Sequence, residues 1–488
     1  MATRSHRLYI DGKWVEAASG ATYTLPNPAT EETVALAADA GREDMERAIA
    51  AARRSFDAGT WRRSSRRDRA RVLEHLADGL EKRKDELREI LVRAHACEYV
   101  THPINIDRPL EFLRRYADLA LRYEFDRVLP THVEPSPMGG PARVVSSLAH
   151  RQPVGVCGLI PTWNFPLYVT VHKIGPALAT GCSMVVKPSP WGPLPDLLVA
   201  EILEECDLPP GVFNVVTGQG PEIGALLAES PQVDMISFTG SHVVGKKIMQ
   251  AGGATLKRLH LELGGKSALI FLADASFESA GPMAASASYF HAGQGCAIFS
   301  RVLVPRPRHD ELVEKMKGFV EGVVKVGDPA DPSVLLGPVI RSERRTAIEG
   351  YIESGRREGA DLVTGGGRPA GLPKGYFLKP TIFANVRNDT RIAREEIFGP
   401  VVSVLPYEDE ADAIRIANDS ELGLSGGIVT RDTAKAIAMA KQIRTGGVSV
   451  NGANNPFAPF GGFKDSGLGR EVMEYGMETF TEIQTIAW

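Results

Sequence analysis

Short β-branched runs alternate with longer amphipathic runs between residues 153 and 263. The longer runs repeat apolar residues at helical spacing, as at Leu198, Ile202 and Cys206. The connections are short, so the pattern predicts a parallel sheet with helices on both faces. Its strands are expected at residues 153–160, 183–187, 211–216, 234–238 and 257–263.

The apolar stretch 166–181 is predicted to be the first of these helices. Gly181 is a typical stop signal at its end. Pro176 lies inside the stretch, and a proline removes one backbone hydrogen bond from a helix. We therefore expect a kink or an early end at this point.

A second alternating series follows Glu262 and predicts a second α/β unit. Residues 131–152 differ from both units, because a Pro/Gly cluster precedes a β-branched run there. The final residues, 478–488, are also strand-like. An exposed strand invites pairing with another chain, so these two segments are expected to take part in a homodimer or homotetramer.

Composition excludes several classes of partner. The chain has 488 residues, of which 43% are hydrophobic and 24% charged, and a net charge of −4. This balance gives no reason to expect nucleic acid or an anionic membrane as a partner. The start lacks the apolar core of a signal peptide, and no apolar run reaches membrane-spanning length.

The five cysteines are widely spaced and form no C-x-x-C pair. This spacing argues against a thiolate metal site, so no metal is expected. It also argues against a disulfide framework, so the expected compartment is a reducing cytoplasm. Cys296 is unusual because it lies between Gly295 and Ala297. A buried cysteine needs no such room, whereas a cysteine approached by another molecule does.

Polar residues follow several predicted strands, at the edge where parallel sheets bind ligands. In "FTGSHVVG", Gly240, Ser241 and Gly245 could admit a phosphate to a helix N-terminus, or could form an ordinary capped turn. Lys187 could reach a ribose or phosphate, or could simply be solvated. Each pattern leaves both interpretations open.

Two further strand ends carry candidate catalytic groups. Glu262 precedes two glycines and could be a general base in a cleft or a surface residue before a turn. Asn164 lies between two aromatic residues and could donate to an oxyanion or cap a helix.

The order and spacing of the motifs are more specific than any one of them. The series resembles the aldehyde dehydrogenase superfamily, over essentially the full chain. Its motifs are "PTWNFP" at 161–166, "KPSP" at 187–190, "FTGS" at 238–241, "LELGGKS" at 261–267, "GQGC" at 293–296, "EEIFGPV" at 395–401 and "PFGGFKDSGLGRE" at 459–471.

The resemblance implies an α/β fold with a Rossmann-like cofactor domain, a second α/β catalytic domain and a small β excursion for oligomerisation. The dinucleotide-binding domain would comprise residues 1–130 and 153–263, and the catalytic domain residues 264–470. Residues 131–152 and 478–488 would form the oligomerisation arm.

The resemblance also implies the chemistry. Cys296 would attack the aldehyde, Asn164 and the Cys296 backbone N–H would hold the oxyanion, and hydride transfer to NAD(P) would leave a thioester. Glu262 would activate the water that hydrolyses it, and Lys173 and Glu471 match positions proposed to pass protons with this base. Residues similar to those that hold the cofactor are Trp163, Lys187, Gly240, Ser241, Gly245, Glu396 and Phe398. Arg301 and His291 are interpreted as structural.

One departure concerns the cofactor. Pro190 stands where many NAD-preferring relatives carry a glutamate that binds the adenosine ribose. No carboxylate remains there to repel a 2′-phosphate, so the cofactor is expected to be NAD or NADP. The usual "ETGK" stretch is also replaced, by residues 95–109, which is expected to alter the rim of the substrate entrance.

The expected substrate is an apolar aldehyde, aromatic or branched aliphatic, because the implied tunnel wall is aromatic and offers no arginine for a carboxylate. Betaine aldehyde is an alternative, since aromatic rings can hold a quaternary ammonium, and a semialdehyde is another. The presence of Glu262 disfavours a CoA-acylating enzyme, and the intact set of roles disfavours a non-catalytic member of the family. The implied wall residues are Phe165, Tyr168, His172, Phe290, Phe457 and Phe460.

Overall fold

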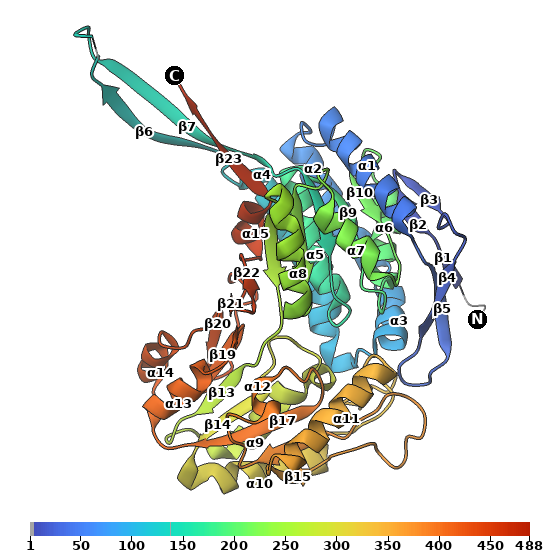
Figure 1. Cartoon of the computed structure of the whole chain (residues 1–488), viewed down its shortest axis with the longest axis vertical. Helices are drawn as coiled ribbons and strands as arrows, with labels where there is room; N and C mark the ends of the chain where they lie inside the picture. Colours follow the sequence, from blue (N-terminus) through green and yellow to red (C-terminus); the bar gives the residue numbers. More distant parts are fainter. Residues whose placement is uncertain (1–3, 137) are drawn as a thin grey trace.

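The computed structural model describes residues 4–136 and 138–488. Two α/β bodies, each built around its own largely parallel sheet, are stacked along the long axis of the molecule, and a narrow three-stranded arm projects from one of them (Figure 1). Each body has its own pair of buried hydrophobic clusters, which cover the two faces of its sheet. No helix in these described ranges combines the length and the apolarity that a membrane crossing requires.

The sheet of the first body has the strand order β22-β12-β11-β8-β9-β10-β2-β3. Its five central strands are parallel, as the alternating pattern predicts. They are β8 (Val156–Ile160), β9 (Ser183–Val186), β10 (Phe213–Val215), β11 (Met235–Thr239) and β12 (Arg258–Glu262). The order reverses between β8 and β11, and this switch point is where doubly wound sheets bind ligands.

Helices cover both faces of this sheet (Figure 1). They are α1 (Arg42–Ala58), α2 (Arg66–Lys82), α3 (Lys84–His95), α4 (Arg108–Arg122), α5 (Pro166–Thr180), α6 (Leu194–Glu204), α7 (Pro221–Glu229), α8 (His242–Gly252) and α15 (Met473–Thr479). The remaining N-terminal strands are β2 (Leu8–Ile10) and β3 (Lys13–Val15) at the sheet edge, and a separate sheet of β1 (Arg4–His6), β5 (Thr33–Ala38) and β4 (Thr22–Pro26).

Helix α5 does not end early at Pro176. It continues to Thr180, and Gly181 then terminates it with a left-handed φ of 97°. The helix is buried along almost its whole length, so tertiary packing outweighs the hydrogen bond that the proline removes. This continuity matters because Lys173 lies in the same helix.

The second body has the strand order β15-β16-β17-β14-β13-β19-β20, parallel except for β15. The strands are β13 (Ala268–Phe271), β14 (Arg301–Pro305), β15 (Asp361–Thr364), β16 (Thr381–Ala384), β17 (Val401–Tyr407), β19 (Ser425–Val429) and β20 (Gly447–Val450). The helices are α9 (Phe277–Tyr289), α10 (His309–Val323), α11 (Ser342–Arg357), α12 (Arg391–Arg394), α13 (Glu410–Asn418) and α14 (Thr433–Ala440).

The arm is a three-stranded antiparallel sheet of order β23-β7-β6. Strands β6 (Asp126–Glu134) and β7 (Arg143–Pro153) form a long hairpin, and β23 (Thr481–Ala487) pairs along β7. Strand β6 begins five residues before the expected arm boundary at residue 131. The division of the chain into domains stays a prediction.

The chain crosses between the two bodies at two neighbouring places. One crossing follows β12, and the other lies between β21 (Phe463–Lys464) and β22 (Gly467–Leu468). Strand β21 belongs to the second body, where it pairs with β18 (Leu422–Gly423). Strand β22 pairs with Leu261 and Glu262 at the edge of the first sheet. Ser466 joins the crossings, because its hydroxyl donates to the Gly264 carbonyl (2.6 Å) and its own carbonyl accepts from the Leu263 N–H (2.9 Å).

Candidate active site

The cysteine lies in a tightly folded loop that follows α9. Residues Phe290–Gly293 form a short turn in which His291 and Ala292 both have a left-handed φ of 51°. Cys296 itself is half-buried, whereas the loop residues before it are buried. The loop therefore leaves Cys296 partly accessible while the residues before it are enclosed.

The buried carboxylate of Glu98 anchors the cysteine loop through His291. Glu98 accepts a hydrogen bond from the Gly337 N–H (2.6 Å), and its other oxygen lies 3.3 Å from His291 Nδ1. Gln294 accepts from the Ile340 N–H (2.9 Å) and donates to the His291 carbonyl (3.3 Å). These contacts support the structural interpretation of His291, and they give the altered stretch at 95–109 a function in anchoring the loop.

Glycines beside the cysteine are needed for close packing. A Cβ at Gly295 would come within 2.7 Å of Ile298, and one at Gly265 would come within 2.3 Å of the Cys296 carbonyl oxygen. The glycines of "LELGGKS" therefore let the cysteine loop lie against the end of β12. This contact brings two distant motifs to one point.

Asn164 follows β8 and reaches the cysteine loop. Its side-chain amide donates to the Gln294 carbonyl at 2.8 Å, two residues before Cys296. The amide carries a second N–H, which is the donor an oxyanion at the cysteine would require. A Cβ at Gly295 would lie 3.7 Å from the ring of the neighbouring Phe165, so both residues of the "NF" pair approach this loop.

Glu262 is the last residue of β12, and its side chain is only 3% exposed. In the described part of the chain neither carboxylate oxygen has a hydrogen-bond partner. Burial raises the pKa of Glu262 to about 8, against the opposing effect of the Lys173 and Arg470 charges. A carboxylate that is buried, unpaired and able to titrate near neutrality has the properties of a general base.

Lys173 and Glu471 are buried beside this carboxylate. Burial lowers the pKa of Lys173, and the charges of Glu471 and Glu262 oppose this effect. Burial likewise raises the pKa of Glu471, which Lys173 opposes. The three groups are thus close enough to influence one another, as a proton path would need, although their roles stay predictions.

The surroundings of the nucleophile disfavour its thiolate form. Burial raises the pKa of the Cys296 thiol to about 12, and the carboxylates of Glu396, Glu262 and Glu471 add to this rise. Since the thiolate is the form that attacks, a nearby base that takes the thiol proton would activate the cysteine.

The residues at the cofactor edge fit a dinucleotide. Ser241 caps α8 by accepting from the Val244 N–H at 3.4 Å, and a Cβ at Gly245 would come within 2.7 Å of Leu263. Lys187 follows β9, and its ammonium donates to the carbonyls of Pro188 (3.2 Å) and Gly218 (3.3 Å). Burial lowers the pKa of Lys187 to about 8. These groups stand on both sides of the switch point, where a phosphate and a ribose can be accommodated.

The residues expected at the nicotinamide end of the cofactor site lie next to the glycines that follow β12. The Glu396 carboxylate accepts from the Gly265 N–H at 2.9 Å, and burial raises its pKa to about 7. Phe398 has a left-handed φ of 55°, and its ring meets that of Trp163 edge-on at 5.6 Å. The aromatic pair and the carboxylate fit a ribose and an adjoining flat ring.

Three of the expected tunnel residues contact Phe112, a residue that the sequence did not single out. Phe112 of α4 contacts the rings of Tyr168 (5.6 Å), His172 (4.3 Å) and Phe457 (5.7 Å). Phe165 and Phe290 form a second, stacked pair at 6.4 Å. Phe460 is placed by a backbone bridge to Glu471. The amphipathic pattern of 108–122 marks Phe112 as a core position but carries no signal of a site.

The expectation that no arginine stands near the tunnel wall is wrong. The guanidinium of Arg115 lies 3.7 Å from the centre of the Phe457 ring, and that of Arg108 lies 5.7 Å from it. Both arginines also hydrogen-bond Glu111 (2.6 and 3.1 Å). The arginines lie on α4, far before Phe457 in the chain, so the sequence alone does not bring them together.

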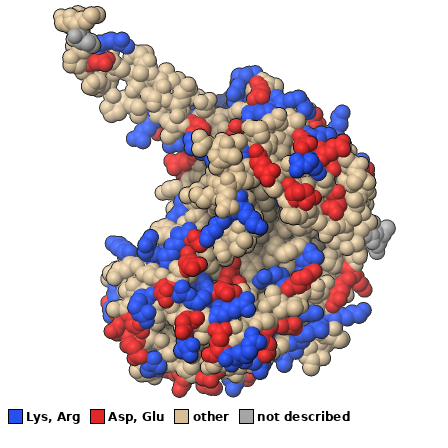
Figure 2. Space-filling model, in the orientation of Figure 1, with Lys and Arg blue, Asp and Glu red and all other residues tan. Residues whose placement is uncertain are grey.

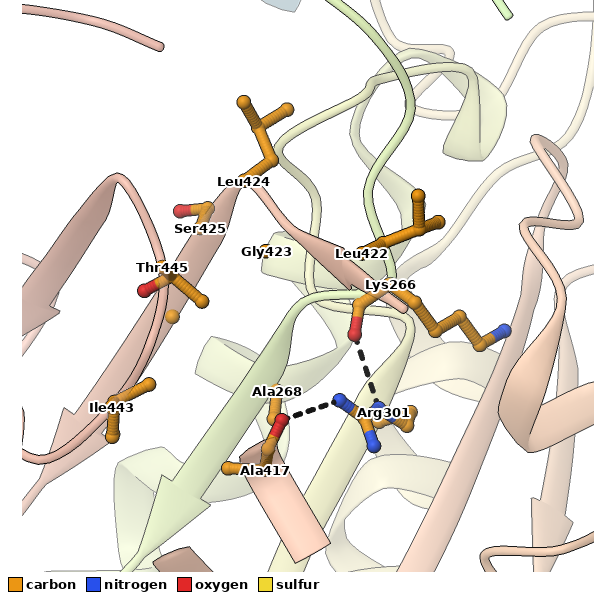
Figure 3. A pocket seen from close by; sticks show the side chains of 11 residues that line it. Lys266, Ala268, Arg301, Ala417, Leu422, Gly423, Leu424, Ser425, Ile443 and Thr445 are labelled. Atoms are coloured by element: carbon orange, nitrogen blue, oxygen red, sulfur yellow. Dashed lines mark hydrogen bonds between the residues drawn. The ribbon is translucent and has the colours of Figure 1, made fainter. Parts of the chain in front are cut away.

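Arg301 is a framework residue. Its guanidinium donates to the carbonyls of Lys266 (3.0 Å), Ile416 (2.9 Å) and Ala417 (3.1 Å), and to Asn388 (3.2 Å). Figure 3 shows Arg301 beside a very small cavity at the start of β13. The Lys266 side chain is directed away from the Arg301 guanidinium. Every donor nitrogen is used, which supports the structural interpretation.

Comparison with known proteins identifies the family. The model of the aldehyde dehydrogenase family matches residues 14–486. A 3-succinoylsemialdehyde-pyridine dehydrogenase from Pseudomonas sp is 42% identical over 482 residues, which are 98% of this chain and 97% of that protein.

Solved structures agree with this assignment. An aldehyde dehydrogenase from Mycobacterium tuberculosis, complexed with NAD+, has a TM-score of 0.93 at 40% identity, and the match covers 100% of this chain and 98% of that one. A mutant of aldehyde dehydrogenase C from Pseudomonas syringae, complexed with NAD+ and octanal, has a TM-score of 0.91 at 38% identity, covering 99% and 96%. The chain therefore belongs to the aldehyde dehydrogenase family, and the enzyme class, the α/β fold and the dependence on NAD or NADP expected from its motifs are confirmed.

Proposed function

We propose that the enzyme oxidises an aldehyde to the carboxylic acid through a thioester on Cys296. The observation that carries this proposal is the meeting of three motifs at one point. Asn164, which follows β8, bonds the cysteine loop, and Gly265, which follows Glu262 and β12, packs against the Cys296 carbonyl.

In this mechanism the Cys296 thiol gives its proton to a nearby carboxylate, and the sulfur forms a bond to the carbonyl carbon. The Asn164 amide and the Cys296 N–H stabilise the oxyanion of the thiohemiacetal. When bound, NAD or NADP accepts the hydride from that carbon. Trp163, Lys187, Gly240, Ser241, Gly245, Glu396 and Phe398 would hold the cofactor.

Glu262 completes the cycle as a general base. Its carboxylate takes a proton from water, the water oxygen bonds to the thioester carbon, and the Cys296 sulfur leaves as thiolate. Lys173 and Glu471 then carry the excess proton away. Because Glu262 is buried and unpaired beside the cysteine, hydrolysis is favoured over transfer of the acyl group to CoA.

An apolar aldehyde, aromatic or branched aliphatic, is the substrate class we propose. The aromatic residues around Phe112 offer an apolar body for contact. Arg115 already covers one face of Phe457, so that ring is not open to a quaternary ammonium, and the positive charge of the arginines further disfavours betaine aldehyde. A semialdehyde with an anionic end remains the second candidate, supported by Arg108 and Arg115.

NAD is the cofactor we favour over NADP. The carboxylates of Glu222 and Asp39 both act on the Lys187 ammonium and raise its pKa against the effect of burial. They could accept hydrogen bonds from a ribose in place of the side chain that Pro190 lacks, and they would repel a 2′-phosphate.

We also propose a homo-oligomer in a reducing cytoplasm. The arm exposes apolar side chains, including Val128, Val144 and Ile483, and Figure 2 shows that it is mostly uncharged. Such an edge is suited to pairing with a second copy of the chain. The described cysteines are all free, as expected in a reducing compartment.

The test is cofactor reduction, followed by absorbance, with NAD and NADP run side by side. 3-Methylbutanal, benzaldehyde, octanal, betaine aldehyde and succinic semialdehyde form the panel, and Cys296→Ala is the control. We expect 3-methylbutanal or benzaldehyde with NAD to give the highest kcat/KM, and no reduction by the mutant. Preference for betaine aldehyde would overturn the substrate class, and activity in Cys296→Ala would overturn the mechanism. Light scattering of the intact chain tests the oligomer, which a monomeric mass would overturn.

A further inference from the structure

A chain of polar side chains lies behind the general base, on strands β11 and β12. Ser237 and His260 are direct cross-strand neighbours, and Glu262 lies two residues beyond His260 on the same face. All three are buried, with exposures of 0%, 1% and 3%. Buried polar residues in the middle of a sheet are costly unless they serve one another or a reaction.

Two hydrogen-bond contacts and one longer contact connect these groups. The Lys173 ammonium donates to the Ser237 hydroxyl at 3.0 Å, and that hydroxyl lies 3.0 Å from His260 Nδ1. The other ring nitrogen, Nε2, lies 3.4 Å from Glu262 Oε1, without the geometry of a hydrogen bond. In the described structure neither this nitrogen nor the carboxylate has a hydrogen-bond partner, so a small rotation of either side chain would let them bond each other.

We propose that His260 and Ser237 are positioning residues that, together with Lys173, orient the Glu262 carboxylate for thioester hydrolysis. This inference rests on the proposed function, and it assigns the orientation of the base to two residues outside the family motifs. Gly469 leaves the room for the imidazole, since a Cβ there would come within 2.8 Å of His260.

The imidazole is neutral, because burial lowers the pKa of His260 to about 4. A neutral ring carries a single N–H, and the tautomer is set by the hydrogen bond that the other nitrogen makes.

Lys173 selects the tautomer of His260 through Ser237. When Lys173 is charged it donates to Ser237, Ser237 donates to Nδ1, and Nε2–H is directed at Glu262. The carboxylate is then held in its ionised form for the next turnover. A lysine acting alone would have no such contact to place the carboxylate.

The experiment measures acyl-enzyme hydrolysis directly, by rapid quench during the first turnovers with excess benzaldehyde and NAD. Ser237→Ala removes one hydroxyl, His260→Phe removes both ring nitrogens, and the double variant removes both links. Ser183→Ala is the matched control, because Ser183 is also buried in this sheet, on β9, and its hydroxyl has no partner in the described chain. Thermal unfolding confirms that each variant is folded.

We expect hydrolysis of the acyl-enzyme to slow about tenfold in Ser237→Ala, while formation of NADH in the first turnover is unchanged. A burst of about one NADH per active site then appears. The double variant is as slow as its slower single variant, since both substitutions break the same series of contacts. Ser183→Ala behaves as the wild type.

Unchanged hydrolysis in Ser237→Ala would overturn the proposal even if His260→Phe failed to fold. Equal slowing of NADH formation and hydrolysis would also overturn the proposal, because that result indicates general damage to the site. Slowing of hydrolysis in Ser183→Ala would overturn it for the same reason. Failure of the proposed function is distinguishable, since the wild-type enzyme would then reduce no cofactor at all.

Discussion

Arg301 and Glu262 are both buried charged residues, but their surroundings are opposite. Arg301, 1% exposed, uses all its donor nitrogens on three carbonyls and one amide oxygen. Glu262 has no hydrogen-bond partner for either oxygen within the described ranges. A buried charge with every partner in place supports the fold, whereas one left without partners is retained for chemistry.

The largest expected effect is on activity at the unpaired site. Glu262→Gln keeps the shape of the side chain but removes the base, so we expect acyl-enzyme hydrolysis to fall by about a hundredfold to ten-thousandfold. Rapid quench of a single turnover measures it, and the exposed Glu314→Gln is the control. Hydrolysis at the wild-type rate in Glu262→Gln would remove the basis of the comparison.

The corresponding change at the satisfied site should affect stability. Arg301→Met leaves several buried carbonyls without a donor, so the free energy of unfolding should fall by about 3 kcal/mol. Urea unfolding at fixed protein concentration measures it. The exposed Arg387→Met should change it by less than about 0.5 kcal/mol. A fall no larger than that of Arg387→Met would show that Arg301 is not a framework residue.

A smaller and more specific effect is expected from pH. Burial raises the pKa of Glu262 to about 8, although Lys173 and Arg470 oppose this, and His260 faces it as a neutral ring. The ionised base is therefore scarce at pH 6 and grows as pH rises. Hydrolysis should increase about tenfold per pH unit up to about 8 and then level off.

The raised pKa of Glu262 also makes the free energy of unfolding depend on pH. A carboxyl whose pKa is raised by folding binds its proton more tightly in the folded state, so its stabilising effect is present at low pH and is lost as pH rises from about 4.5 to about 8. Glu262→Gln should therefore gain stability relative to the wild type over that range. A difference that is constant with pH would contradict the assigned cause.

Much of this arrangement follows from local sequence. The strands of the first sheet and the motifs at their ends are predictable, because periodicity and turn residues are local signals. The continuity of α5 past Pro176 is not, since it depends on burial by distant segments. The contact of Arg115 with Phe457 and that of Glu98 with His291 are also invisible in sequence, because each joins residues far apart in the chain.

His260 is an intermediate case. The spacing of His260 and Glu262 on a predicted strand places them on one face, so sequence alone indicates their proximity. It does not indicate the partner Ser237, because only the register of β11 against β12 brings it opposite His260. Register of parallel strands is set by the packing of the whole sheet.

The paired crossings between the two bodies have a consequence for the base. Ser466 joins the crossings, and β22 pairs with Glu262 itself, so the backbone of the base is held by chain arriving from the second body as well as by its own strand. Glu262 is therefore tied to both bodies at once, and its place in the site does not depend on either body alone.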